Sequence, residues 1–290
     1  MSESFIKKNP SKESLDTLLK FYQNLEYGLA NDLALLISKE FPYHPTSWKV
    51  LGAIYRHKGL LNDSLVCNQK AVKLNLKDSD AHNNLSNCLR MLGRLEEALR
   101  SSKKSIEINP NIAEYYVNQG LALNELRKFN EAELSNRQAI ILNPILLEAY
   151  FSLGFTLQKL KRLDEAEASY RYVIKLNPHF SESYCNLGVI LHDLLRFDEA
   201  EEMFKKSISL EPNHAISYSN LGVTLVQSRR LKEAEKNFMI AIGLDKNHSE
   251  AIAGLGDILM QKGNHREGLL NLRIANGSIF FNIKNGMSVK

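Results

Sequence analysis

The sequence contains few cysteines, and none of them has the spacing of a disulfide framework or a zinc site. Three cysteines occur in 290 residues, at Cys67, Cys88 and Cys185. Scattered cysteines in an odd number fit a reducing compartment better than an oxidising one. We therefore expect a cytoplasmic protein.

Long apolar segments and blocks of like charge are also absent. The N-terminal stretch MSESFIKKNPSKES has no apolar run of the kind found in signal peptides. No stretch approaches the length of a membrane span. The net charge is only +4, and basic and acidic residues are interspersed. We expect neither a membrane nor a nucleic acid as partner.

Catalytic and cofactor-binding motifs are missing. The sequence has no H-E-x-x-H, G-x-S-x-G or P-loop pattern. It also shows no arrangement of nucleophile, base and oxyanion site. The sequence therefore predicts a protein that is not an enzyme and that needs no cofactor.

What the sequence does contain is a repeat of 34 residues. Asn186 to Glu201 reads NLGVILHDLLRFDEAE, and Asn220 to Glu235 reads NLGVTLVQSRRLKEAE. A fixed period of this size is typical of a repeat architecture. The rows of the repeat begin at residues 45, 79, 113, 147, 181, 215 and 249, and a degenerate eighth row begins at residue 11.

Each row reads as two helices joined by a turn. Tyr184, Leu187, Gly188 and Leu191 have the spacing of one helix face, and a second apolar segment ends before Pro212. A column of small residues in the first helix and another in the second helix predict close packing of the two. In this interpretation Gly188 faces Ala200.

The second helices also carry a predicted start signal. Asp164 and Asp198 each stand three residues before a glutamate. This spacing resembles an acidic capping box, which would place these aspartates at helix N-termini.

On these residues the chain resembles the tetratricopeptide repeat (TPR) family. Tyr184, Leu187, Gly188, Leu191 and Ala200 match the family pattern, as do Phe204, Ser207 and Pro212. The resemblance implies an all-α, right-handed TPR solenoid of about seven to eight repeats. It further implies that the first helices line a concave face that binds proteins or peptides.

The chain divides into three parts on this interpretation. Residues 1–10 would be a flexible N-terminus, and residues 11–276 would form the solenoid. Residues 277–290 would form a C-terminal cap or an extended tail, in which Ile279, Phe281 and Ile283 alternate as in a strand and Asn285-Gly286 marks a turn. Self-association through the solenoid ends is a further possibility for such an architecture.

A column of asparagines is the first candidate binding feature. The residue two positions after the large aromatic should lie about 200° from the core stripe of its helix. This column reads Val50, Asn84, Asn118, Ser152, Asn186, Asn220 and Gly254. It is similar to the asparagine ladder in the TPR superhelix of O-GlcNAc transferase, and by that resemblance the four asparagines would contact peptide backbones. Solvated residues inherited by duplication are the alternative.

Apolar residues on the predicted free face are the second candidate. Leu121, Phe155 and Val189 belong to one column, and Phe151 lies one turn before Phe155. Contiguous exposed apolar residues mark interaction sites. Burial between adjacent first helices is the alternative, particularly for Val189.

Three further columns are charged or titratable. Asp80, Glu114, Glu148, Glu182 and Glu250 occupy first helical turns, where they would compensate helix dipoles. The turns within rows carry the basic residues Arg94, Arg127, Lys128, Lys161, Arg162, Arg196, Arg229 and Arg230, interpreted as a solvated edge. His179, His214 and His248 are one row apart, and this distance is too large for a shared metal ion.

The sequence thus predicts a non-enzymatic scaffold that holds a protein or peptide in a concave groove. The alternative is a substrate-recruiting module of a glycosyltransferase or another modifying enzyme whose catalytic part is on a separate chain.

Overall fold

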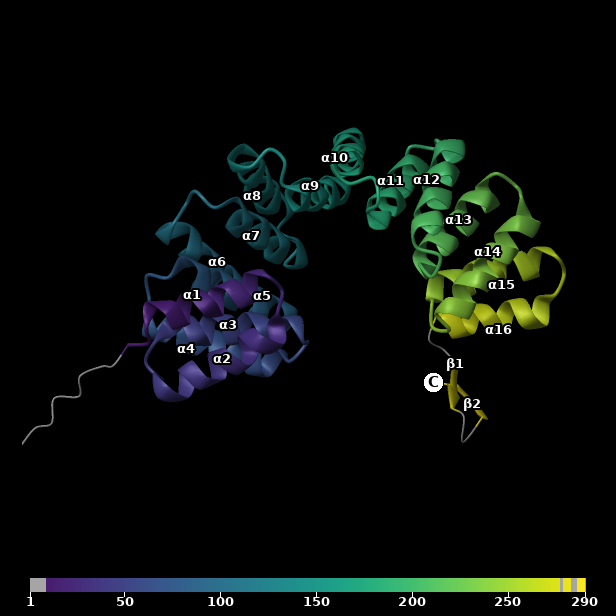
Figure 1. The fold of residues 1–290 in the computed structure, drawn as a ribbon. Helices are drawn as coiled ribbons and strands as arrows, with labels where there is room; N and C mark the ends of the chain where they lie inside the picture. The colour runs from purple at the N-terminus through teal and green to yellow at the C-terminus, as the bar shows by residue number, and fades with distance from the viewer. Residues whose placement is uncertain (1–8, 277–278, 283–285, 290) are drawn as a thin grey trace, which may run out of the picture. The chain divides into compact units, whose positions relative to one another are not determined.

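The computed structural model describes residues 9–276, 279–282 and 286–289 and contains sixteen helices in that part of the chain (Figure 1). The first helices of the rows are α1 (Lys12–Gln23), α3 (Pro45–His57), α5 (Ser79–Met91), α7 (Ala113–Glu125), α9 (Leu147–Lys159), α11 (Ser181–Asp193), α13 (Ala215–Gln227) and α15 (Ser249–Gln261). The second helices are α2 (Tyr27–Glu40), α4 (Leu61–Leu74), α6 (Leu95–Ile108), α8 (Phe129–Leu142), α10 (Leu163–Leu176), α12 (Phe197–Leu210), α14 (Leu231–Leu244) and α16 (His265–Ala275). The prediction of an all-α solenoid of helix hairpins is confirmed.

Two short strands follow the last helix. β1 (Ile279–Asn282) pairs antiparallel with β2 (Gly286–Val289), with Ile279 opposite Val289. Strand structure at Ile279 and Phe281 agrees with the alternation in the sequence. Of the predicted flexible N-terminus, residues 1–10, the first eight residues lie outside the described part of the chain. Ile283 and Asn285 lie outside it as well, so whether residues 277–290 form a cap stays a prediction.

The helices are grouped in two compact units, residues 1–152 and 153–290, and the boundary between them falls within α9. In each unit a first helix packs against its own second helix and against the next first helix, as α11 does with α12 and α13. Stacking of this kind buries a continuous core although each row alone is too small to have one.

The same turn conformation recurs in every row. The residue that ends the turn between the paired helices has a positive φ at Leu25, Gly59, Gly93, Arg127, Lys161, Leu195, Arg229 and Gly263, spaced 34 residues apart. This set includes Leu25, in the degenerate row that begins at residue 11. The first row therefore has the same hairpin geometry although its first helix lacks the glycine of the repeat.

The contact between the two helices of a row is made by the glycine column, and in several rows a large side chain of the second helix packs on it. A Cβ added at Gly188 would lie 2.6 Å from Phe204, one turn beyond Ala200. Gly222 meets Phe238 and Gly154 meets Tyr170 in the same way. The glycine thus makes room for a large side chain of the second helix. The predicted contact between the two small columns is also present, since Ser64 donates to the carbonyl of Gly52 at 2.7 Å and a Cβ at Gly256 would lie 3.0 Å from the carbonyl of Gly268.

One row has a different pair of residues at this contact. Ser86 replaces the glycine in α5, and its hydroxyl donates to the carbonyl of Ala98, 2.8 Å away. The position that holds Phe204 in another row is here Ser102, which is fully buried. A larger residue on one helix is therefore matched by a smaller one on the other.

The second helices start without the predicted capping box. The N-cap residues of α10 and α12 are Arg162 and Arg196, and neither accepts a side-chain capping bond. Asp164 lies in the first helical turn instead of at the cap, because the helix begins two residues earlier than the pattern suggested.

Arginines at these N-cap positions connect successive rows. Arg196 donates through Nε and Nη2 to the Glu199 carboxylate, at 2.7 Å each, and through Nη1 to Glu167 of the preceding second helix at 2.6 Å. Arg230 repeats this fork with Glu233 and Glu201. A planar guanidinium is suited to such bidentate pairing.

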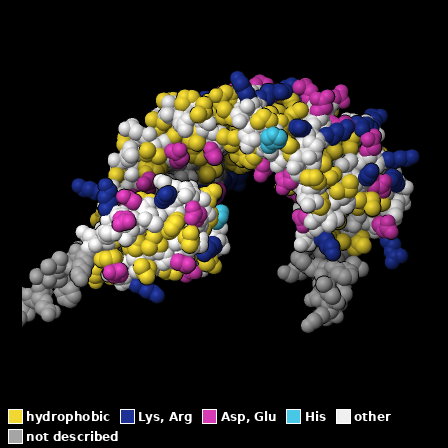
Figure 2. Space-filling view, viewed as in Figure 1, with side chains coloured by type: hydrophobic (Ala, Val, Ile, Leu, Met, Phe, Trp, Pro, Cys, Tyr) yellow, Lys and Arg dark blue, Asp and Glu magenta, His cyan; other side chains and the backbone are white. Residues whose placement is uncertain are grey.

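The predicted basic edge is therefore partly neutralised by its own neighbours. Arg94 and Arg162 also pair with the glutamate three residues on. Figure 2 shows basic and acidic side chains interspersed on the visible face, including that of the second unit. These arginines stabilise helix starts and row contacts, which leaves fewer of them available to an anionic partner.

We predict that Gly188→Ala lowers the free energy of unfolding by about 1–3 kcal/mol, because the new methyl group would overpack Phe204. Gly243→Ala is the matched control in the same unit, since a Cβ there meets nothing within 4 Å. Gly243→Ala should raise the free energy of unfolding by about 0.5–1 kcal/mol, because alanine is preferred over glycine in a helix. Denaturant titration followed by circular dichroism measures both, and equal effects would contradict the packing account.

We also predict a pH-dependent effect of Glu201→Gln. Burial raises the pKa of Glu201, but hydrogen bonds from Lys205 and Arg230 outweigh burial and leave the pKa below its usual value of 4.5. A carboxyl group whose pKa is lower in the folded than in the unfolded state stabilises the fold at pH values above its unfolded-state pKa. This stabilisation is lost as the pH falls through the folded-state pKa. The melting temperatures of wild type and variant should therefore differ most near neutral pH and converge in acid.

The control for this measurement is Glu202→Gln on the exposed side of α12. Its melting temperature should follow that of the wild type at each pH. A gap between wild type and Glu201→Gln that stays constant from neutral to acidic pH would refute the ion-pair assignment.

Candidate functional site

The asparagine column lies between rows and is not an open face. Asn84, Asn118, Asn186 and Asn220 are all partly buried. The column members Val50 and Ser152 are only 4% and 2% exposed. A Cβ at Gly254, in the same column, would lie 2.4 Å from Phe238 of the preceding second helix. The column points away from the core of its own hairpin, but the preceding row covers part of it.

Two of the four amides are tied to the preceding first helix. Asn118 Nδ2 donates to Asn83 Oδ1 at 2.8 Å, and Asn220 Nδ2 lies 3.8 Å from the Cys185 sulfur. Each bond crosses from one row to the one before it. These contacts orient the amides and leave their oxygen atoms for a ligand hydrogen bond.

The apolar candidates differ in exposure. Leu121 is partly buried against a cluster that includes Val117 and Ala149. Phe155 is 36% exposed, and the Lys159 ammonium lies 5.0 Å from its ring centroid. Phe151, which belongs to the other compact unit, is partly buried. Phe155 is thus the most accessible aromatic of the predicted set.

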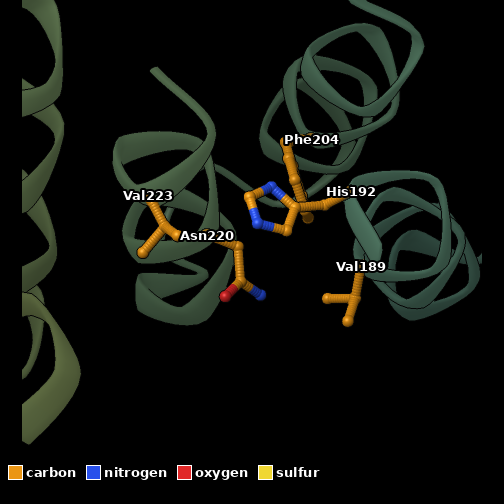
Figure 3. A pocket seen from close by; sticks show the side chains of 5 residues that line it. All are labelled: Val189, His192, Phe204, Asn220 and Val223. Atoms are coloured by element: carbon orange, nitrogen blue, oxygen red, sulfur yellow. The ribbon is translucent and has the colours of Figure 1, made fainter. Parts of the chain in front are cut away.

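Val189 and Asn220 come together around a small hollow in the second unit. This apolar hollow, about 50 Å³ in volume, is lined by Val189, His192, Phe204, Asn220 and Val223 (Figure 3). Val189 and His192 extend from α11, while Asn220 and Val223 extend from α13. Phe204, the ring that packs on Gly188, completes the lining, so the row packing also shapes the hollow.

His192 is linked to the backbone of Asn220 through the hydroxyl of Thr224. The Thr224 hydroxyl donates to the carbonyl of Asn220 at 2.9 Å and therefore accepts from His192 Nδ1 at 3.1 Å. Burial lowers the pKa of His192, outweighing the opposite influence of Asp193. The ring is therefore neutral at pH 7, and it links α11 to α13 without adding a charge.

A second, larger hollow adjoins Asn220 on the other side. This acidic hollow, about 380 Å³ in volume, is lined by Ile216, Asn220, Asp245, Asn247, His248, Ser249 and Glu250. The residues from Asp245 to His248 form the turn into α15, and Ser249 and Glu250 open that helix. Asn220 is the residue shared by both hollows.

Sequence reasoning missed most of the acidic hollow. The sequence pattern indicates only a helix-dipole role for Glu250, and it excludes His248 as a ligand of a shared metal ion. Two irregularities in the repeat signal the site. Ile216 stands where five rows have an acidic residue, and Asp245 stands where four preceding rows have asparagine.

The described residues form neither a metal site nor a membrane-spanning helix. They contain no group of three His, Cys, Asp or Glu side chains placed to hold a metal ion. Among the same residues, no helix has both the length and the apolar character needed to cross a membrane.

Comparisons with known proteins agree with the repeat. Sequence models of the tetratricopeptide repeat family match residues 79–112, 147–180, 181–214 and 215–248. A search of curated proteins finds no match.

Solved structures show the same fold. A chain of the APC/C hetero-tetramer Cut9–Hcn1 aligns with a TM-score of 0.76 at 13% identity over 86% of this chain, which spans 49% of that one. YrrB, described as a TPR protein with an unusual peptide-binding site, aligns at 25% identity with a TM-score of 0.52, over 64% of this chain and 95% of its own. MamA from Desulfovibrio magneticus RS-1 is 24% identical, with a TM-score of 0.54 over 59% of this chain and 96% of its own.

The matched rows begin at the first residues of α5, α9, α11 and α13, and the unmatched rows have the same hairpin geometry. The chain is a tetratricopeptide repeat protein.

Proposed function

We propose that this chain is a non-enzymatic scaffold that binds an extended peptide segment of another protein along its first helices. The observation that carries the proposal is the position of Asn220 between two hollows of different chemistry. A side-chain amide both donates and accepts, so it can pair with a peptide backbone of any sequence. The hollows on either side would then take alternate side chains of the same peptide.

The other asparagines extend this arrangement along the first helices. Asn84 and Asn118 occupy the equivalent position in the first unit, and Asn186 occupies it in the second. All are partly exposed, so each can still reach a ligand. The peptide-binding site of the TPR protein YrrB supports the same class of ligand.

We predict that replacing Asn84, Asn118, Asn186 and Asn220 together by alanine weakens peptide binding by about 30-fold or more. The estimate assigns about 0.5 kcal/mol to each lost backbone hydrogen bond. Peptides selected from a displayed random library on the wild-type chain serve as ligands, and fluorescence anisotropy measures their affinity.

The control variant replaces Asn130 and Asn237, which lie on the second helices α8 and α14. It should bind the selected peptides as the wild type does. Unchanged affinity in the quadruple variant, with helix content preserved in all three proteins, would refute the proposal.

We further predict that Phe155→Ser reduces binding of peptides that span α9 and leaves the melting temperature nearly unchanged, because this ring is already 36% exposed. Thermal melting and anisotropy on the same sample separate the two effects. A large drop in melting temperature would show that Phe155 belongs to the core.

A further inference from the structure

The acidic hollow lies where the repeat departs from its own pattern. Asp245 introduces a carboxylate in a column that otherwise reads Asn75, Asn109, Asn143, Asn177 and Glu211. Glu250 adds a second carboxylate, whose side chain is 76% exposed. Across the hollow, Ile216 is 52% exposed in a column that is acidic in five other rows. The hollow thus combines two negative charges with one aliphatic wall.

His248 contributes a polar atom that the protein does not satisfy. Its side chain is only 9% exposed. Its Nδ1 lies 3.4 Å from the Ala251 amide and 3.3 Å from the Glu250 carboxylate, whereas its buried Nε2 has no hydrogen-bond partner. Buried polar atoms are normally paired. A backbone group of a bound peptide offers both a donor and an acceptor, so it would pair with Nε2 in either tautomer once the ring turns toward the hollow.

The electrostatic balance of the hollow favours a cation. Among the described residues that line it there is no lysine or arginine, and Lys246 of the same turn is not one of them. The N-terminus of α15 contributes about half a positive charge. The two carboxylates carry more charge than this, so the lining has a net negative charge when His248 is neutral.

We propose that the acidic hollow binds a lysine or arginine side chain of the peptide held at Asn220, and that the apolar hollow takes a small apolar residue near it. This inference rests on the proposed function and specifies its ligand. The methylene groups of a basic side chain pack on Ile216 while the charged head meets Asp245 and Glu250. A hollow of about 380 Å³ is within the range of ligand sites.

The geometry distinguishes an organic cation from a metal ion. The described residues contain no group of three His, Cys, Asp or Glu side chains that could hold a metal. The aliphatic wall at Ile216 also has no role toward a small hydrated ion, whereas it suits the stem of a long side chain.

The test uses the full chain and peptides selected on it from a random displayed library. The diagnostic variant is Asp245→Asn combined with Glu250→Gln. Asparagine is the residue that four other rows carry at the position of Asp245, so the fold should tolerate it. The control combines Glu182→Gln with Glu211→Gln, which removes two charges from the same two columns. Glu182 accepts from Ser181 at 3.2 Å as Glu250 accepts from Ser249, and Glu211 also accepts from Ser181, at 2.7 Å.

We expect the selected peptides to share a lysine or arginine close to a small apolar residue. The diagnostic variant should weaken their binding by about 3- to 20-fold, the range for two exposed ion pairs, and the loss should shrink at high salt. When the basic residue of the peptide is replaced by methionine, the wild type and the diagnostic variant should bind the peptide with equal affinity. The control variant should bind as the wild type does.

The outcomes separate this inference from the proposed function. Peptides whose binding depends on Asn220 but which carry no shared basic residue would overturn the inference and leave the function standing. The same holds if the diagnostic variant binds them with unchanged affinity. If no selected peptide is weakened by Asn220→Ala, the peptide-binding function fails, and this inference fails with it.

Discussion

In the rows that begin at residues 147, 181 and 215, the paired helices meet at a contact in which one helix has almost no side chain and the other has a large one. At Gly188 the missing Cβ leaves room for Phe204, and at Gly222 for Phe238. This contact sets how closely the paired helices approach, and interiors packed to crystal-like density tolerate little change in volume. The next first helix then packs on both, so its position follows from the same contact. The apolar hollow follows as well, because Phe204 forms part of its lining.

Charge has separate roles on the two sets of helices. At the starts of the second helices, arginines such as Arg196 and Arg230 join glutamates of their own helix and of the preceding one. Those charges neutralise each other within the protein. At the start of α15, Asp245 and Glu250 face a hollow that no lysine or arginine lines in the described chain. The second helices therefore use charge to connect rows, while the charge at the start of α15 belongs to the proposed recognition site.

The candidate site could be predicted from the sequence only in part. The columns of the repeat single out Asn220 and Val189, and the structure brings these two residues to one hollow. The expectation of a freely exposed asparagine column was too simple, because Val50 and Ser152 of that column are buried. Helical periodicity gives the direction of a side chain relative to its own hairpin. Whether another row covers that direction depends on residues 34 positions away, and periodicity alone contains no such information.

The sequence alone determined the period, the helix pairs and the family, because these follow from local residue preferences repeated in register. Positions such as Pro45 and Ser79 open first helices both in the pattern and in the structure. Only the tertiary structure decided what each column touches: that Gly188 meets Phe204, that Arg162 and not Asp164 is an N-cap, and that the hollows adjoin Asn220. The physical reason is that packing between rows joins side chains from different repeats, and their sizes and charges combine only when the rows are stacked.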